Sequence, residues 1–215
     1  MTSAPVNLCI VDYGMGNIGS VRNAFRFLGA SVSIAGTPRD LSRATAYVLP
    51  GVGAFGEAVA ALTRLGLIDA LAENVLGRKR PLLGICLGMQ LLFEESLEKG
   101  RHRGLGWIPG RSVRFPYRPD LLVPHVGWSS VEANSQDRLF QNIPAEACFY
   151  FDHSYYLECE VDTVTSICHH GHGFAASVQC GNIFATQFHP EKSQRSGLKM
   201  LRNFLNACSD GVPCR

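Results

Sequence analysis

Gly84-Ile85-Cys86-Leu87-Gly88 ends a buried apolar run and opens onto a helical pattern. A strand that passes through such a glycine-flanked residue into a helix makes a sharp, crowded turn. The turn lifts the Cys86 sulfur out of the sheet edge and places it at a helix N-terminus, where the dipole favours thiolate over thiol. We expect the strand over 81–86 and the helix over 87–99. A free cysteine is most often a small buried apolar residue, but the flanking glycines and Gln90 favour a nucleophile here.

The residues before this turn alternate between short β-rich runs and helical patterns. Apolar residues recur at i, i+3, i+4 and i+7 from Val21 to Leu28, which is typical of an amphipathic helix. Such alternation indicates βαβ units and a mostly parallel sheet covered on both faces. The expected strands are 6–12, 31–35 and 46–49, and two helical stretches broken at Leu65-Gly66 are expected between residues 56 and 76.

The second half of the chain changes to closely spaced strand patterns. Cys180-Gly181-Asn182 separates two of them and is typical of a hairpin turn. The expected strands are 112–115, 148–157, 163–169, 174–179 and 183–188, followed by a helix over 194–207. The sequence thus predicts an α/β fold: a mostly parallel sheet flanked by helices, with an antiparallel extension. The chain length predicts a single domain over 1–215.

The composition argues against several classes of protein. The 215 residues are 46% hydrophobic and carry a formal net charge of +2, too small to indicate nucleic-acid binding. No signal-peptide pattern opens the chain and no apolar run reaches transmembrane length, so we expect a cytoplasmic protein without membrane contact. The eight cysteines include no C-x-x-C pair, and we expect neither a metal nor another cofactor.

His189-Pro190-Glu191 supplies the two further groups that a cysteine nucleophile needs. His189 can accept the thiol proton and later donate it to a leaving amine. Glu191 can bind the other ring nitrogen and stabilise the imidazolium. Sites in open α/β sheets form at the carboxyl ends of the strands, where the expected strands place Cys86 and His189. We therefore predict Cys86, His189 and Glu191 as catalytic residues for acyl transfer through a thioester.

A thioester route also requires donors for the developing oxyanion. The backbone N–H of Leu87, which follows the nucleophile, is one candidate. The glycine-rich Pro50-Gly51-Val52-Gly53 offers the second, because the Val52 and Gly53 N–H groups can turn toward a reacting carbonyl. One such donor lowers the barrier by about 3–4 kcal/mol. An ordinary strand-ending turn is the alternative interpretation of this segment.

Together these segments resemble a known family. Pro50–Gly53, Gly84–Gln90 and His189–Ser193 look like the motifs of the class I (triad) glutamine amidotransferases, whose fold is flavodoxin-like. Within that family, four further segments look like the glutaminase subunits of imidazole glycerol phosphate synthase: Asp12–Asn17, Gly106–Gly110, Pro124–Trp128 and Tyr150–Tyr155. The resemblance runs from about Val6 to Leu205, and the combined motifs are highly specific.

The resemblance implies that Cys86 attacks glutamine and that the thioester is hydrolysed to glutamate, with release of ammonia. It implies that the substrate is held by Gly53, Gln90, Ser154 and Tyr155. It further implies a heterodimer with a HisF-like (β/α)8 barrel synthase, which uses the ammonia to form imidazole glycerol phosphate in histidine biosynthesis. The positions that match this interface are Asn17, Trp128, Tyr150 and Lys192. In the family, Pro50–Gly53 can hold an inactive orientation until the partner is loaded, so the isolated chain is expected to hydrolyse glutamine poorly.

Two positions depart from the family's usual pattern. Ser129 stands where asparagine usually follows Gly-Trp, and Asp152 stands where an apolar residue is usual. Either difference can change which partner the chain binds. The main alternative is therefore a paralogue that supplies ammonia to a barrel enzyme building amidino sugars for surface polysaccharides. A free-standing cysteine hydrolase and a catalytically silent interaction protein are two further interpretations. Gln90 disfavours the first of these, and the intact Cys-His-Glu set disfavours the second.

Overall fold

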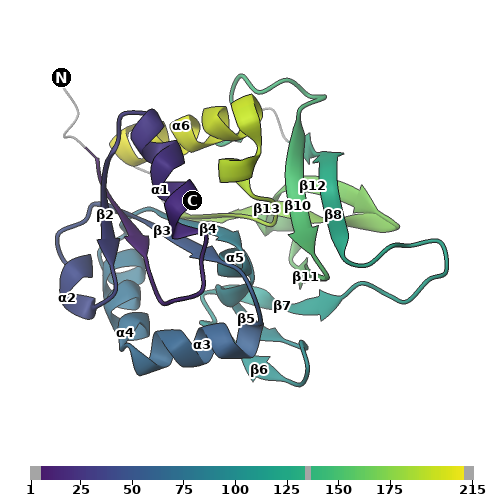
Figure 1. Ribbon diagram of the computed structural model, residues 1–215, viewed down its shortest axis with the longest axis horizontal. Helices are drawn as coiled ribbons and strands as arrows, with labels where there is room; N and C mark the ends of the chain where they lie inside the picture. The colour runs from purple at the N-terminus through teal and green to yellow at the C-terminus, as the bar shows by residue number, and fades with distance from the viewer. Residues whose placement is uncertain (1–5, 134–136, 211–215) are drawn as a thin grey trace.

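A central sheet of eight strands lies between two layers of helices in the computed structural model, which describes residues 6–133 and 137–210 (Figure 1). The strand order is β2-β1-β3-β4-β14-β13-β12-β9. The pairs from β2 to β14 are parallel and the remaining pairs are antiparallel, so the predicted α/β fold with an antiparallel extension is confirmed. The strands are β1 (Asn7–Val11), β2 (Ser31–Ala35), β3 (Ala46–Gly51), β4 (Leu82–Cys86), β9 (Glu132–Ala133), β12 (Val164–His170), β13 (His172–Cys180) and β14 (Ile183–Thr186).

Both faces of the central strands are covered, which explains their continuous apolar sequences. In β1, Leu8 and Ile10 face one helical layer, whereas Cys9 and Val11 face the other. Every residue of β3, β4 and β14 is buried, as a parallel sheet between two helical layers requires. The first layer holds α1 (Ile18–Phe27) and α6 (Gln194–Asp210); the second holds α2 (Pro38–Leu41), α3 (Phe55–Arg64), α4 (Leu67–Ala72), the π-helical turn η1 (Glu73–Gly77) and α5 (Leu87–Leu91).

Two smaller sheets lie on the side of the molecule toward which β12 and β13 extend (Figure 1). One pairs β8 (His125–Ser130) with β10 (Cys148–His153). The other has the order β11 (Tyr155–Cys159), β7 (Ile108–Arg114), β5 (Phe93–Ser96) and β6 (His102–Arg103). The 3-10 turns η2 (Val161–Thr163) and η3 (Pro190–Lys192) complete the described elements.

The expected helix over 87–99 is wrong beyond its first turns. Helix α5 ends at Leu91, and the chain continues as strand β5. The reason is tertiary: the N–H groups of Leu105 and Trp107 donate to the carbonyls of Leu91 and Leu92, both at 2.8 Å. These bonds replace the next helical turn, and they start the small sheet that β5 shares with β7.

The expected strand over 148–157 is interrupted. It breaks at Ser154 into β10 and β11, which belong to different sheets. The pairing strand β8 was not predicted, because His125–Ser130 carries a glycine and alternates weakly. The other predicted strands lie within a few residues of the observed ones, and the hairpin turn holds with Gly181 at φ +55°. Across residues 6–133 and 137–210, no helix combines the length and apolarity needed to cross a membrane.

Candidate active site

Cys86 occupies a strained, crowded turn between β4 and α5. Its φ of +55° and ψ of −111° lie outside the regions that a side chain other than glycine favours. A Cβ on Gly88 would lie 1.8 Å from the Leu49 carbonyl oxygen, so the start of α5 rests directly on β3. The predicted nucleophile turn is therefore present. The helix behind it has five residues, so its dipole is weaker than the expected 13-residue helix would give.

A cavity of about 320 Å³ opens in front of the sulfur. Of the predicted catalytic, oxyanion and glutamine-binding residues, all except Glu191 line it: Val52, Gly53, Cys86, Leu87, Gln90, Ser154, Tyr155 and His189. These residues come from β4, α5, the loop after β3, the β10–β11 junction and the segment that follows β14. Residues distant in sequence thus meet at the carboxyl edge of the sheet, as the strand order predicts.

Glu191 lies behind His189, away from the cavity. Its Oε1 is 2.9 Å from His189 Nδ1, and the two side chains are 1% and 3% exposed. The carboxylate makes Nδ1 the protonated nitrogen, which leaves Nε2 for the sulfur. Ser193 fixes the loop, because its hydroxyl donates to the His189 carbonyl at 2.6 Å and accepts the Tyr150 N–H at 3.0 Å.

The electrostatics around His189 favour the imidazolium. Burial lowers its pKa, but the hydrogen bonds and charges of Cys86 and Glu191 outweigh that effect and raise the pKa to about 10. The Glu191 Oε2 is buried without a hydrogen-bond partner among the described residues, so the histidine is the group that compensates this carboxylate. The arrangement supports an ion pair between thiolate and imidazolium.

Gln187 and Asp152 also contact the sulfur, and neither was predicted to do so. Gln187 Nε2 lies 3.7 Å from Sγ as a donor, and the Asp152 carbonyl oxygen lies 3.9 Å from it as an acceptor. The Gln187 N–H can donate to a thiolate, whereas the Asp152 carbonyl can accept a proton only from a thiol. Gln187 could have been predicted, because residues two apart on an extended chain share a face and His189 is a predicted catalytic residue.

The Val52 N–H, a predicted oxyanion donor, points elsewhere in this conformation. It donates to the Met15 carbonyl at 3.1 Å, although the Val52 side chain lines the cavity. Rotation of the Gly51–Val52 peptide would free it, and Gly51 on one side of that peptide has no Cβ to restrict the rotation. The Leu87 N–H belongs to the first turn of α5, where helical N–H groups lack a partner within the helix.

The cavity wall also offers polar groups for an amino-acid substrate. Gln90 Nε2 donates to the Tyr155 carbonyl at 3.1 Å and to Gln187 Oε1 at 3.0 Å. Glu98, which no sequence pattern predicted, also lines the cavity, and its Oε2 accepts the Phe55 N–H at 2.6 Å. Its other carboxylate oxygen can meet a ligand cation. No sequence motif marked Glu98, because its position depends on β5 replacing the expected helix.

Three of the four predicted interface residues form one cluster: Trp128, Tyr150 and Lys192. The rings of Trp128 and Tyr150 are 6.0 Å apart, and Lys192 Nζ lies 5.2 Å from the Tyr150 ring centroid. Trp128 is 48% exposed, a large value for a tryptophan on a folded surface. Asn17 precedes α1, which packs against the turn that contains Lys192.

Comparison with known proteins agrees with this geometry. Residues 9–208 match the family model described as Glutamine amidotransferase class-I. The chain is 49% identical over 197 residues to Imidazole glycerol phosphate synthase subunit HisH 1 of Campylobacter jejuni, covering 92% of this chain and 98% of the relative. It is 47% identical over 198 residues to subunit HisH of Moorella thermoacetica, covering 92% and 93%.

Solved structures share the fold at lower identity. A chain of PurLQS from Thermotoga maritima superposes with a TM-score of 0.74 at 20% identity, covering 94% of this chain and 99% of that one. A glutamine amidotransferase from Thermotoga maritima gives a TM-score of 0.64 at 20% identity, covering 96% of this chain and 84% of that one. These similarities establish the fold of the chain.

Proposed function

The chain belongs to the class-I glutamine amidotransferase family, and we propose that it is the glutaminase subunit of an imidazole glycerol phosphate synthase. The observation that carries the proposal is the Cys86 turn facing a buried His189–Glu191 pair across a cavity of amino-acid size. Relatives at 40–49% identity over most of the chain carry the name of that subunit. We place the activity in a single cytoplasmic domain.

The reaction begins when the Cys86 thiolate attacks the side-chain amide carbon of glutamine. The oxyanion that forms is held by the Leu87 N–H and, after rotation of the Gly51–Val52 peptide, by the Val52 N–H. His189 donates its proton to the leaving nitrogen, so the C–N bond breaks and ammonia departs. The thioester that remains is hydrolysed by a water from which His189 takes a proton, and glutamate is released.

The cavity residues would select glutamine by its two ends. Glu98 presents a carboxylate to the α-ammonium group, and the backbone at Ser154 and Tyr155 binds the α-carboxylate region. Gly53 and Gln90 flank the side-chain amide next to the sulfur. No cofactor is needed for this chemistry.

We propose that ammonia passes directly to a HisF-like (β/α)8 barrel protein seated on the Trp128–Tyr150–Lys192 surface. An exposed tryptophan beside a buried active site is typical of an interface centre. Direct transfer keeps the ammonia unprotonated, since free ammonia at neutral pH is mostly ammonium. The Val52 N–H bond to Met15 supports low activity until the partner binds.

Glutaminase assays with and without the barrel protein and its acceptor substrate test this function. We expect glutamine hydrolysis to rise at least about 100-fold in the loaded complex, which corresponds to one recovered oxyanion donor. Rapid hydrolysis by the chain alone would instead identify a free-standing hydrolase.

A second candidate is a paralogue that serves a barrel enzyme of amidino-sugar synthesis. The observations that favour it are the positions of Ser129 and Asp152 on the partner-facing strands. Titration of the chain with both kinds of barrel protein separates the two candidates, because the cognate barrel alone should activate glutamine hydrolysis.

A further inference from the structure

Six consecutive polar groups connect the partner-facing strand β8 to the catalytic sulfur. Ser129 Oγ lies 2.9 Å from His125 Nε2, and His125 Nδ1 lies 3.0 Å from His153 Nε2. His153 Nδ1 lies 2.8 Å from the Tyr155 carbonyl oxygen. That carbonyl also accepts the Gln90 amide, which bonds to Gln187, which in turn contacts Cys86 Sγ.

The direction of every hydrogen bond in the first half of this path follows from its end. A carbonyl oxygen can only accept, so His153 carries its proton on Nδ1 and presents a lone pair at Nε2. His125 must then donate from Nδ1, and its own Nε2 must accept the Ser129 hydroxyl proton. With both rings kept neutral by their burial, each is held in the Nδ1–H tautomer by its neighbour.

Packing and burial keep the two rings in this state. The His125 ring is stacked between Phe151 and His170, with centroid separations of 4.8 and 4.2 Å. His125 and His153 are 5% and 6% exposed. Burial lowers the pKa of both rings, to about 4 for His125 and about 3 for His153, and neighbouring histidines lower them further.

We propose that Ser129, His125 and His153 are positioning residues for the glutamine site, acting through the Tyr155 carbonyl. This inference rests on the proposed glutaminase function. The carbonyl has two donors, His153 from the partner side and Gln90 from the catalytic side, so its place fixes both the substrate pocket and the Gln90–Gln187 pair beside the sulfur. Ser129 is the outermost member and supplies the hydroxyl donor for His125 Nε2.

The matched variants are Ser129→Ala, which removes the donor, and Ser129→Thr, which keeps it. Ser129 is half-buried on β8, and the exposed Ser130 next to it gives the control Ser130→Ala. In the complex with the barrel protein, we expect Ser129→Ala to raise the KM for glutamine about fivefold, the effect of one hydrogen bond, with little change in kcat. Ser129→Thr and Ser130→Ala should match the unmodified protein. An unchanged KM in Ser129→Ala, or a Thr variant as impaired as the Ala variant, overturns the proposal.

Nitrogen-15 NMR of the histidine rings tests the path without any catalytic assay. At pH 7.5 the chain should show His125 and His153 as neutral Nδ1–H tautomers, whereas neutral imidazole in water prefers Nε2–H. Ser129→Ala should shift His125 toward the Nε2–H tautomer. If either ring is charged or carries its proton on Nε2 in the unmodified protein, the proposed hydrogen-bonded path is refuted, even if glutaminase activity is found. Conversely, correct tautomers in a chain that no barrel activates would refute the proposed function alone.

Discussion

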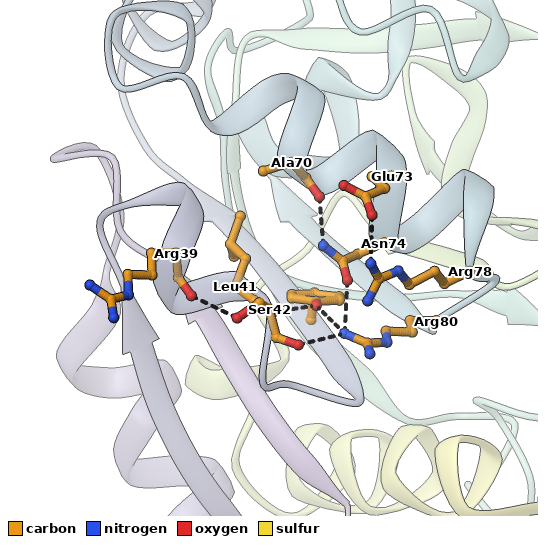
Figure 2. Close-up of polar contacts among 9 residues, drawn as sticks. Arg39, Leu41, Ser42, Ala70, Glu73, Asn74, Arg78 and Arg80 are labelled. Carbon is orange, nitrogen blue, oxygen red and sulfur yellow. Dashed lines mark hydrogen bonds and ion pairs between the residues drawn. The ribbon is translucent and has the colours of Figure 1, made fainter.

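The two ends of strand β4 differ in how their polar groups are paired. At the amino end, Arg80 Nη1 bonds to the Ser42 carbonyl, the Tyr47 hydroxyl and Asn74 Oδ1, at 3.2, 3.1 and 2.7 Å. Figure 2 shows this cluster, in which the Asn74 amide also bonds to the Ala70 carbonyl. At the carboxyl end, Cys86 has a strained backbone.

Two of the buried polar atoms that lack a hydrogen-bond partner among the described residues lie at this carboxyl end. The Tyr13 hydroxyl, next to Gly51, and Glu191 Oε2 are buried at the carboxyl end without hydrogen-bond partners among the described residues. Side chains at the amino end find partners: the Asn182 amide, for example, donates to the carbonyls of Val75 and Arg80. Groups that stabilise the fold and groups that serve the reaction thus lie at opposite edges of one sheet, since a strained or unpaired group costs stability and is kept where the reaction uses it.

The largest effect expected is the loss of activity in Cys86→Ala. Without the nucleophile, glutaminase activity of the barrel complex should fall by about 10⁴-fold or more, as measured by glutamate release.

The backbone strain at Cys86 can be measured separately, from the stability of two inactive variants. Cys86→Gly should also be inactive, yet its free energy of unfolding should be about 1 kcal/mol higher than that of Cys86→Ala, because glycine accepts a positive φ. A glycine variant that is less stable than the alanine variant would remove backbone strain from the comparison.

At the opposite edge, Arg80→Ala should change stability and leave catalysis alone. The substitution removes three hydrogen bonds and leaves Asn74 Oδ1 without its Arg80 partner, so we expect the free energy of unfolding to fall by about 2–3 kcal/mol. Chemical denaturation gives this value, and kcat/KM per folded molecule should stay unchanged. Arg78→Ala is the control: its ion pair with Glu73 is exposed at both side chains, so the expected change is below about 1 kcal/mol. A change in kcat/KM for Arg80→Ala would show that the two edges are coupled.

Acid should destabilise strands β8 and β10, near the carboxyl end of β4, before it destabilises the segment around Arg80 at the amino end. His125 and His153 have folded pKa values of about 4 and about 3 against 6.5 when unfolded, so they stabilise the fold above pH 6.5 and lose that contribution as the pH falls toward 4. The loss at pH 5 is on the order of 2 kcal/mol for each ring. His189 has the opposite sign: its pKa is raised to about 10, so its contribution is complete below 6.5 and is lost as the pH rises toward 10.

Hydrogen exchange at pH 7 and pH 5 measures this difference. Exchange corrected for intrinsic rates should increase in β8 and β10, whereas the segment around Arg80 should keep its protection, since guanidinium keeps its charge in this range. Equal loss of protection at both edges would place the acid-sensitive groups elsewhere.

Sequence reasoning succeeded where one local pattern sufficed. Apolar periodicity predicts the alternating strands and helices up to Cys86. The glycines around Cys86 predict a crowded turn, and the close approach of Gly88 to Leu49 explains why a glycine is needed there. Cys86, His189, Gln90 and Tyr155 meet as predicted because parallel strands end at one edge.

The remaining features depend on contacts between distant segments. Helix α5 stops at Leu91 because Leu105 and Trp107 take its carbonyls, and no periodicity in 87–99 records that competition. Glu98 reaches the cavity as a consequence. The His125–His153 contact joins two strands, of which β8 was not predicted, so its chemistry became visible only with the strand pairing.

Two buried tyrosines give the smallest expected effect and the closest comparison. Tyr47, on β3, donates its hydroxyl proton to the Leu41 carbonyl at 2.6 Å and accepts from Arg80. Tyr13 is 3% exposed, and its hydroxyl lies against Gly51 and Leu87 without a hydrogen-bond partner among the described residues. Burial raises the pKa of both phenols, so both remain protonated at neutral pH.

Replacement by phenylalanine removes one oxygen atom in each case and keeps the ring packing. Tyr47→Phe should lower the free energy of unfolding by about 1–2 kcal/mol, because it removes the shorter of two hydrogen bonds to the Leu41 carbonyl and one of the three acceptors of Arg80 Nη1. Tyr13→Phe should be neutral or stabilising by up to about 1 kcal/mol, since it removes a buried hydroxyl that gains no bond. Urea denaturation of both variants at one pH gives the two differences directly. If Tyr13→Phe cost as much as Tyr47→Phe, the Tyr13 hydroxyl would be paired in solution, and the division between a saturated edge and an unsaturated catalytic edge would not hold.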